Sequence, residues 1–330
     1  MNKIIFLVAI FFASPGLAVL TSSDKFLYDV SGNEKKILLC GDVHFLDYPD
    51  MDKKQLQDLK QILISRGQHD QNIVNVYIEK PPACSEYNTV LTDVCDYLKD
   101  LPFTLTKNSE IRCASHVANF LFHERTRPEW VDQDMCFDTA KKKVTVTDVT
   151  FGSLVKEYED EKRKVDSFFN TLPSDGKLAK VLTQEQECLE NSYDYMSQVI
   201  RNLNIADEDS CYEVAFRLHK TENKSKLLHA ISKTFDNLFE VHLLRKLLKN
   251  HPDNCKNFVV IAGLAHVCKM NPFLQRIGAK LDSGYATRYD LVLKTVTPLP
   301  YKKMDLFAPI PTWSEYARSW FSWQAWRAWR

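Results

Sequence analysis

Two segments of the chain join an apolar run to the sequence Gly-x-x-His. The first is the run 37–40 followed by Gly41-Asp42-Val43-His44, and the second is the run 258–262 followed by Gly263-Leu264-Ala265-His266. Short apolar runs of this kind are typical of buried strands. Glycine lets the backbone turn sharply and approach a ligand closely. Since ligands bind at the carboxyl ends of strands in open α/β sheets, we expect two imidazoles to face one crevice.

A carboxylate follows the next apolar segment. The spacing predicts a helix from about residue 50 to 65 and a strand over 73–78 that ends at Glu79. Strand, helix and strand in succession form a βαβ unit, which implies a parallel pair with a right-handed crossover. We therefore expect His44 and Glu79 to leave neighbouring strands at the same edge of the sheet.

Two histidines and a carboxylate are a common ligand set for a metal ion that keeps positions open for water and substrate. His44 and His266 would bind through neutral imidazole. Glu79 would be the third ligand or the base that deprotonates a metal-bound water. Asp42 would be a further ligand or would orient an imidazole. The predicted cofactor is a divalent ion (Mn, Co or Zn), which would make bound water more acidic.

Each Gly-x-x-His segment alone is a weak signal, because an isolated histidine is more often a loop residue of no special function. The combination of two such segments with Glu79 is what indicates a site. The remaining histidines fall in expected helices or loops without a paired ligand, and we interpret them as structural or solvent-facing: His116, His123, His219, His229, His242 and His251. The sequence contains no GxSxG, P-loop or GxGxxG motif, which argues against serine hydrolases, NTPases and dinucleotide enzymes.

The overall charge argues against nucleic acid as a partner. The 330 residues include 43 basic and 43 acidic side chains, so the formal net charge is zero. Such a balance produces no long-range field that would attract a polyanion. A small molecule or a peptide is the expected substrate class.

The first 18 residues resemble a Sec signal peptide. Lys3 precedes the apolar run 4–13, and Pro15, Gly16 and Ala18 follow it. This order of a positive start, an apolar run and small residues predicts cleavage after Ala18. The apolar run is short for a bilayer span, although an uncleaved anchor is the alternative. We expect an exported protein, either periplasmic or secreted.

Nine cysteines in an exported chain make disulfides plausible. They show no CxxC or zinc-ribbon spacing, and an odd number leaves at least one thiol outside any intrachain bridge. Cys84 with Cys95 or Cys113 is a candidate bridge. Cys40 lies inside an apolar strand and is interpreted as a small buried hydrophobe.

The remaining pattern predicts an α/β fold whose mostly parallel or mixed sheet is flanked by helices. Residues 151–203 and 210–250 have helical periodicity, and the charges of 155–164 are typical of a solvated helix face. Other expected elements are a polar lead-in over 19–36, a helix over 87–99, a strand over 102–105 or 110–113, a helix over 116–124, a polar loop over 125–143, a helix over 268–277 and a last strand over 290–295. The predicted parts are a signal peptide (1–18), two halves of the α/β domain (19–150 and 236–297), an all-helical insertion (151–235) and a tail (298–330).

The tail combines a proline-rich linker with a tryptophan-rich segment. Aromatic residues recur every three or four positions between 313 and 330, with Arg318, Arg327 and Arg330 among them. As a helix, this segment would present a broad aromatic face next to cations, which suits a membrane interface or a protein partner. A terminal helix docked on the domain is the alternative.

The chain resembles the TraB/Tiki group of the erythromycin-esterase/ChaN-like superfamily. The resemblance rests on Gly41–His44, Glu79 and Gly263–His266, and it covers residues 37–125 and 235–295. It implies an α/β fold with the site at one sheet edge, and His44, Glu79 and His266 as site residues. The group's arginine motif has its best counterpart in Arg112 and a weaker one in Arg125. The candidate catalytic residues are therefore Glu79, Asp42 and Arg112, of which Asp42 stands where many relatives have another residue.

Three functions follow as alternatives. The first is an exported metal-dependent hydrolase of peptide or ester bonds. The second is a non-catalytic haem or metal binder, as in the ChaN-like branch. The third is a secreted protein that binds a membrane or a partner through residues 313–330.

Overall fold

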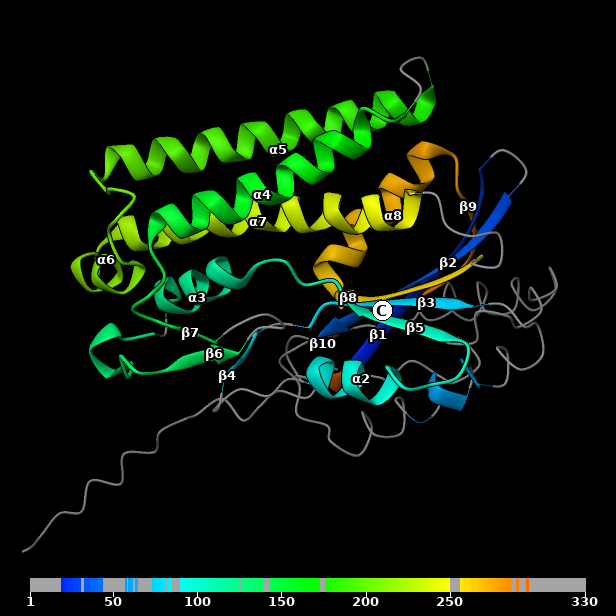
Figure 1. The fold of residues 1–330 in the computed structure, drawn as a ribbon, viewed down its shortest axis with the longest axis horizontal. Coiled ribbons are helices and arrows are strands. Elements are labelled where there is room, and N and C mark those ends of the chain that lie inside the picture. Colours follow the sequence, from blue (N-terminus) through cyan, green and yellow to red (C-terminus); the bar gives the residue numbers. More distant parts are fainter. Residues whose placement is uncertain are drawn as a thin grey trace, which may run out of the picture.

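In the computed structural model, the strands that lead to the predicted site residues belong to a six-stranded mixed sheet (Figure 1). Its strand order is β5-β3-β8-β2-β1-β9, with bounds Thr104–Asn108, Val74–Ile78, Asn257–Gly263, Asn33–Val43, Val19–Val30 and Lys280–Ala286. The structure describes residues 19–30, 33–43, 57, 59–61, 63–64, 73–80, 82–84, 90–124, 126–138, 143–172, 176–249, 256–286, 289–290 and 295–296. The first four strands in this order are parallel, and β1 and β9 extend the sheet in antiparallel fashion. The predicted α/β class with a mixed sheet is confirmed.

The central strands are buried on both faces. All residues of β3 and β8 are buried, as expected for strands that helices cover from two sides. Leu38, Val76 and Val259 belong to one core cluster with α2 (Val90–Leu98) and with Leu59 and Leu63, which lie in the helical residues around position 60. Residues of the opposite parity belong to a second cluster with α7 (Glu222–Leu248) and α8 (Leu264–Ile277). This alternation is the period-two pattern of a strand.

A helical layer covers the α7 side of the sheet. In Figure 1, α4 (Phe151–Phe169), α5 (Lys177–Asn202) and α7 run side by side, with the short α6 (Cys211–Arg217) at one end. Below them lie α3 (Cys113–Phe122), the 3-10 helix Pro128–Trp130, and a small sheet of order β4-β6-β7 (Ala83–Cys84, Cys136–Asp138, Lys143–Thr145). The helices of this layer have their own core, which includes Leu121, Phe151 and Phe235.

Several predictions were wrong in ways that long-range pairing explains. The expected polar lead-in contains β1, which pairs with both β2 and β9. β2 and β3 are parallel, but β8 lies between them, so they are not neighbours. The expected strand over 102–105 is β5, shifted to 104–108, and no strand forms over 110–113. The predicted last strand is replaced by two short strands in which Asp290 faces Thr295.

Other expectations changed in detail. The predicted polar loop over 125–143 contains the 3-10 helix and β6 and reaches β7. The boundary expected at residue 235 falls inside α7, which continues without interruption to residue 248. Cys95 is a free thiol, so the Cys84–Cys95 bridge is not formed, whereas Cys40 is buried as predicted. The signal peptide, His44, the linker and the tryptophan-rich tail lie outside the described residues.

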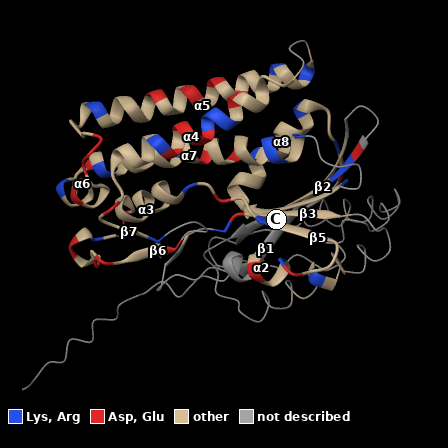
Figure 2. Cartoon of the chain, in the orientation of Figure 1, with Lys and Arg blue, Asp and Glu red and all other residues tan. Residues whose placement is uncertain are grey.

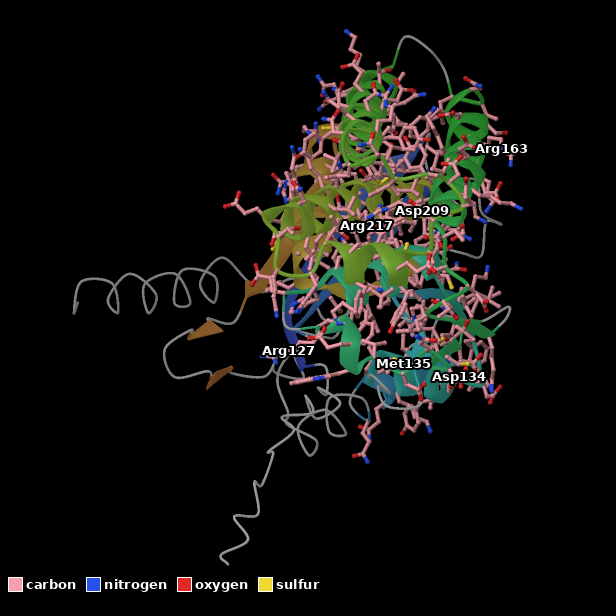
Figure 3. All side chains as sticks on the ribbon, turned by 90° about the vertical axis from the view of Figure 1, so that its left-hand side faces the viewer. Arg127, Asp134, Met135, Arg163, Asp209 and Arg217 are labelled. Atoms are coloured by element: carbon pink, nitrogen blue, oxygen red, sulfur yellow. The ribbon has the colours of Figure 1, made fainter. Side chains whose placement is uncertain are left out.

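The charge-rich face of α4 was only partly solvated. Figure 2 marks acidic and basic residues along the helices of this layer, and Figure 3 shows the labelled Arg163 on the outside of the ribbon, with a side chain that is 78% exposed. Glu161, in contrast, is 3% exposed and faces α7. Among the described helices, none combines the length and the apolar character that a bilayer span requires.

Candidate functional site

The strands that lead into the two Gly-x-x-His segments lie side by side. β2 and β8 are adjacent and parallel, and their register pairs Asp42 with Gly263. β8 also pairs with β3, and the Glu79 N–H donates to the Ile261 carbonyl over 2.9 Å. Both Gly263 and Glu79 therefore lie at one carboxyl edge, as the sequence predicted. The structure describes the backbone of Asp42 but not its side chain, and it does not describe His44.

Glu79 links this edge to the start of α8. The side chain is buried, and its Oε2 accepts a hydrogen bond of 2.6 Å from the Gly263 N–H. A carboxylate at this place is stabilised by the partial positive charge of a helix N-terminus. Gly263 has φ −52° and ψ 141°, which other residues also adopt. What position 263 supplies here is its N–H, rather than the special backbone freedom that the sequence suggested.

His266 lies in the first turn of α8, which begins earlier than the predicted helix. Its Nδ1 is 3.0 Å from Glu240 Oε1, and its Nε2 is 3.2 Å from Arg112 Nη1. A guanidinium can only donate hydrogen bonds, so Nε2 must accept. The Nδ1–H consequently donates to Glu240, which also contacts the Lys269 ammonium at 2.9 Å. His266 is thus a neutral imidazole held by a carboxylate.

Arg112 is the centre of the arrangement. Its Nε and Nη2 donate to the two oxygens of Glu110 over 2.9 and 2.8 Å, and Nη2 also donates to Glu79 Oε1 over 2.5 Å. Its Nη1 donates to Asp236 Oδ1 over 2.8 Å and to His266 Nε2. The guanidinium carries five N–H groups, so these contacts use all of them. The carbon of the guanidinium is 4.2 Å from the centre of the Phe239 ring, a cation–π contact.

Burial and charge oppose one another at Arg112. Burial alone lowers the pKa of the guanidinium, but Glu110 and Glu79 outweigh it and raise the pKa well above its ordinary value. At Glu110, burial raises the pKa of the carboxyl group. The charges of Arg112 and then His116 more than reverse this effect, so the pKa of Glu110 falls well below its ordinary value. Both groups are therefore held in their charged forms.

We call Glu79, Glu110, Arg112, Asp236, Glu240 and His266 the sheet-edge cluster. Its four carboxylates face the cations Arg112 and Lys269, which leaves an excess of two negative charges among the described groups. Asp236 is its most accessible member, with a side chain 35% exposed. The cluster therefore contains an oriented imidazole, a guanidinium and one carboxylate that reaches solvent.

Glu79 and His266, the two described members of the predicted metal-ligand set, both contact Arg112. His266 Nε2 lies 3.6 Å from Glu79 Oε1 and 3.9 Å from Asp236 Oδ1. Arg112 donates to all three of these atoms and occupies the single lone pair of His266 Nε2, whereas the carboxylate oxygens keep further lone pairs. Within the described part of the chain, no group of three or more His, Cys, Asp or Glu side chains is arranged to hold a metal ion. Binding at Glu79 and His266 would require Arg112 to withdraw.

Sequence reasoning missed four members of the site: Glu110, Asp236, Phe239 and Glu240. Two signals were present. Glu110 stands two residues before Arg112, and Asp236 and Glu240 are four residues apart among the apolar positions Phe235, Leu238, Phe239 and Val241. Polar residues spaced by four on an apolar helix share one face and can reach a common neighbour. Arg125, the weaker counterpart of the arginine motif, is not among the described residues.

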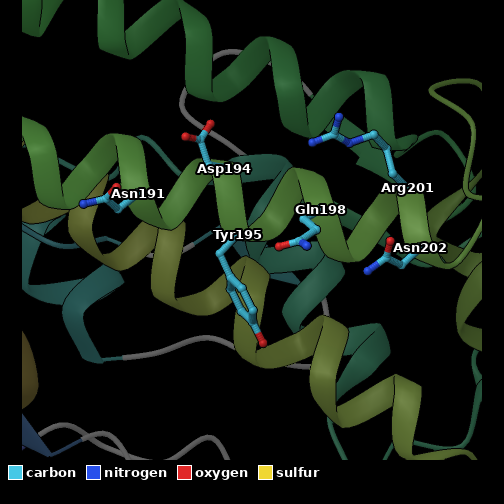
Figure 4. A pocket seen from close by; sticks show the side chains of 6 residues that line it. All are labelled: Asn191, Asp194, Tyr195, Gln198, Arg201 and Asn202. Carbon is cyan, nitrogen blue, oxygen red and sulfur yellow. The ribbon is translucent and has the colours of Figure 1, made fainter.

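A second polar feature lies elsewhere. A hollow of about 760 Å³ lies along α5 and is lined by Asn191, Asp194, Tyr195, Gln198, Arg201 and Asn202, the six side chains that Figure 4 shows. None of the sheet-edge residues lines it. No protein-family model, no curated protein and no solved structure matches the chain.

Proposed function

We propose that the protein is a hydrolase of ester or peptide bonds whose active site is the sheet-edge cluster. The observation that carries this proposal is the state of His266. Its Nδ1–H is fixed on Glu240, and the Nε2 lone pair is directed at the guanidinium of Arg112. A neutral imidazole oriented by a carboxylate is the arrangement of a general base.

In the proposed reaction, the Arg112 Nη1–H first turns from His266 Nε2 to the carbonyl oxygen of the substrate, which frees the Nε2 lone pair. His266 Nε2 then takes a proton from a water molecule as the water oxygen attacks the carbonyl carbon, and Glu240 stabilises the resulting imidazolium. The Arg112 N–H stabilises the negative charge that develops on the carbonyl oxygen. The imidazolium finally gives its proton to the leaving alcohol or amine, which restores the neutral histidine.

The proposed active site is open to solvent at Asp236. Asp236 contacts the same Arg112 nitrogen as His266, and its side chain is partly exposed. Substrate would approach from this side, because the remaining partners of Arg112 are buried. The negative excess of the cluster favours neutral or cationic substrates over anionic ones.

The test is a hydrolysis screen of the purified full chain with chromogenic esters and fluorogenic peptides. Wild type is compared with His266→Gln and with the matched control His229→Gln, which lies on α7 beside Tyr195. We expect turnover in wild type and in the control, and none above background in His266→Gln. Equal turnover in all three proteins would contradict the proposal.

Binding of a divalent metal ion, expected from the pair of Gly-x-x-His segments, is a separate proposal with its own test. Its support is the chemistry of His44, Glu79 and His266; the position of Arg112 speaks against it. Mass spectrometry of metal bound to wild type, His44→Ala and His266→Ala after incubation with manganese, cobalt or zinc decides the matter. Near-stoichiometric metal that both variants lose would restore metal-dependent hydrolysis or metal binding without catalysis.

Export and surface binding are also proposed from the sequence. Mass spectrometry of the protein secreted by a bacterial host tests cleavage after Ala18. Deletion of residues 313–330 tests the tail: loss of binding to anionic vesicles, with the fold intact by circular dichroism, would support a membrane interface.

A further inference from the structure

Helix α3 begins without a cap of its own. The residue at its N-cap position is Arg112, whose side chain makes no cap hydrogen bond, because a guanidinium has no acceptor atom for a backbone N–H. The first N–H groups of a helix have no partner within the helix. A partner for them must therefore come from elsewhere in the fold.

Glu157 of α4 supplies that partner. Its Oε2 accepts from the Ala114 N–H over 2.7 Å, and its Oε1 accepts from the Ser115 N–H over 3.2 Å. On the other side of the same turn, Glu110 Oε1 accepts from the N–H groups of Ile111 and Arg112 over 2.9 and 2.8 Å. Two carboxylates thus hold the backbone immediately before and immediately after Arg112.

We propose that Glu157 is a positioning residue of the sheet-edge cluster: by binding the first turn of α3, its carboxylate fixes the place of Arg112. The effect on catalysis rests on the proposed function, whereas the effect on the backbone does not. No sequence motif pointed to Glu157, because it stands within the charge-rich run of α4.

The ionisation of Glu157 offers a readout. Burial raises its pKa most strongly, the N–H groups of Ala114 and Ser115 lower it and Glu110 raises it, and the net result is a pKa of about 7. Since the folded pKa lies above the ordinary 4.5, protonation between pH 7 and 4.5 favours the folded state globally. Locally it has the opposite effect, because a protonated acid keeps only one strong acceptor oxygen for two N–H donors.

The neighbouring charges allow this effect to be separated from others. Glu110 is paired with Arg112 and with His116 Nε2, which is 3.0 Å away. One turn further along α4, Glu161 is paired with Lys164, His242 and Arg245. Because the His116 imidazole contacts Glu110, it needs a variant of its own.

The experiment is amide hydrogen exchange at Ala114 and Ser115 in the full chain at pH 6 and pH 8, corrected for intrinsic rates. In wild type we expect exchange to be about fivefold faster, relative to the intrinsic rate, at pH 6, which corresponds to the loss of one hydrogen bond. In Glu157→Gln, the amides of Ala114 and Ser115 should exchange fast at both pH values. The exposed Glu159→Gln and the variant His116→Gln should behave like wild type.

Protection that does not change with pH in wild type would overturn the proposal. So would pH dependence that persists in Glu157→Gln and disappears in His116→Gln. If the screen has found hydrolysis, Glu157→Gln should also flatten the acid limb of the pH–rate profile. Exchange as expected in a protein without hydrolytic activity would leave the positioning role in place and remove only the proposed function.

Discussion

Helix α7 contacts two clusters that contain the same residue types. On one side, Glu240 holds His266 next to Arg112 in the sheet-edge cluster. On the other side, Glu161 of α4 binds His242 Nδ1 over 2.5 Å and Arg245 Nη2 over 3.0 Å. We call Glu161, Lys164, His242 and Arg245 the α4–α7 cluster. Both contain a buried imidazole, a carboxylate and a guanidinium.

The two clusters differ in how the imidazole is used and in access to solvent. Both nitrogens of His266 have partners, and its neighbour Asp236 is partly exposed. His242 Nε2 is buried and has no hydrogen-bond partner among the described residues. Burial, more than any other factor, lowers the pKa of His242, although Glu161 opposes it. The α4–α7 cluster lies between two helices, with its carboxylate and imidazole closed to solvent.

Residue type therefore does not distinguish a candidate active site from a structural ion pair. Position does: the sheet-edge cluster draws on four separate parts of the chain at the carboxyl ends of parallel strands, where ligands bind in such sheets. The α4–α7 cluster joins two helices that pack against one another.

The largest expected difference is in catalysis. His266→Gln should lower the hydrolysis rate by about 10² to 10⁴, the usual contribution of a general base. His242→Gln should leave the rate within about twofold of wild type, because its imidazole does not reach the sheet edge. Steady-state kinetics on the best substrate of the screen measures both. A comparable loss in the two variants would break the distinction between the clusters.

Removal of a guanidinium should destabilise the protein more at the sheet-edge cluster than at the α4–α7 cluster. Arg112→Met leaves Glu79 and Glu110 buried without their cation and should cost about 3–5 kcal/mol of the free energy of unfolding. Arg245→Met should cost about 1 kcal/mol, because Lys164 and His242 still contact Glu161. Urea unfolding at neutral pH measures the two losses. Equal values would show that the five hydrogen bonds of Arg112 add no special stability.

Acid should affect the α4–α7 cluster through Glu161. Burial raises its pKa, but the hydrogen bond and charge of His242, then Lys164 and Arg245, lower it to about 2. A depressed folded pKa contributes stability that is complete above the ordinary value of 4.5 and is lost as the pH falls towards 2. Over this pH range, wild type should lose about 3 kcal/mol of the free energy of unfolding. Glu161→Gln should not show this loss. Parallel pH profiles in urea unfolding would contradict this expectation.

The smallest expected effect concerns Phe239, whose ring contacts both Arg112 and His266. Phe239→Leu should be about 1 kcal/mol more destabilising than Phe235→Leu, since only the first loses a buried cation–π contact. Phe235 is the matched control because it is fully buried on the same helix. Thermal unfolding of the two variants gives the difference.

The strand-end motifs were predictable because they combine a buried run with glycine and histidine. That logic placed Glu79, Gly263 and His266 at one edge, and Arg112 was reached through a family resemblance. Asp236 and Glu240 were not predicted, because periodicity indicates the buried face of a helix but not the sheet edge that the face meets. β1 was not predicted because polar residues such as Ser22, Ser23 and Asp24 interrupt the apolar pattern of a strand. The strand is defined instead by its pairing with β2 on one side and β9 on the other. The metal site, the signal peptide and the tail remain predictions.

The place of β8 in the sheet has a consequence for folding. It lies between β2 and β3, yet it is synthesised after both, and about 180 residues separate it from the end of β3. Until β8 pairs, β1 with β2 and β3 with β5 are two separate pieces, and closing so long a loop slows folding. Gly263 and His266 enter the fold with the same strand and the helix that follows it. The step that joins the two pieces of the sheet therefore also completes the candidate active site, and a nascent chain that ends before residue 257 has neither the joined sheet nor the site.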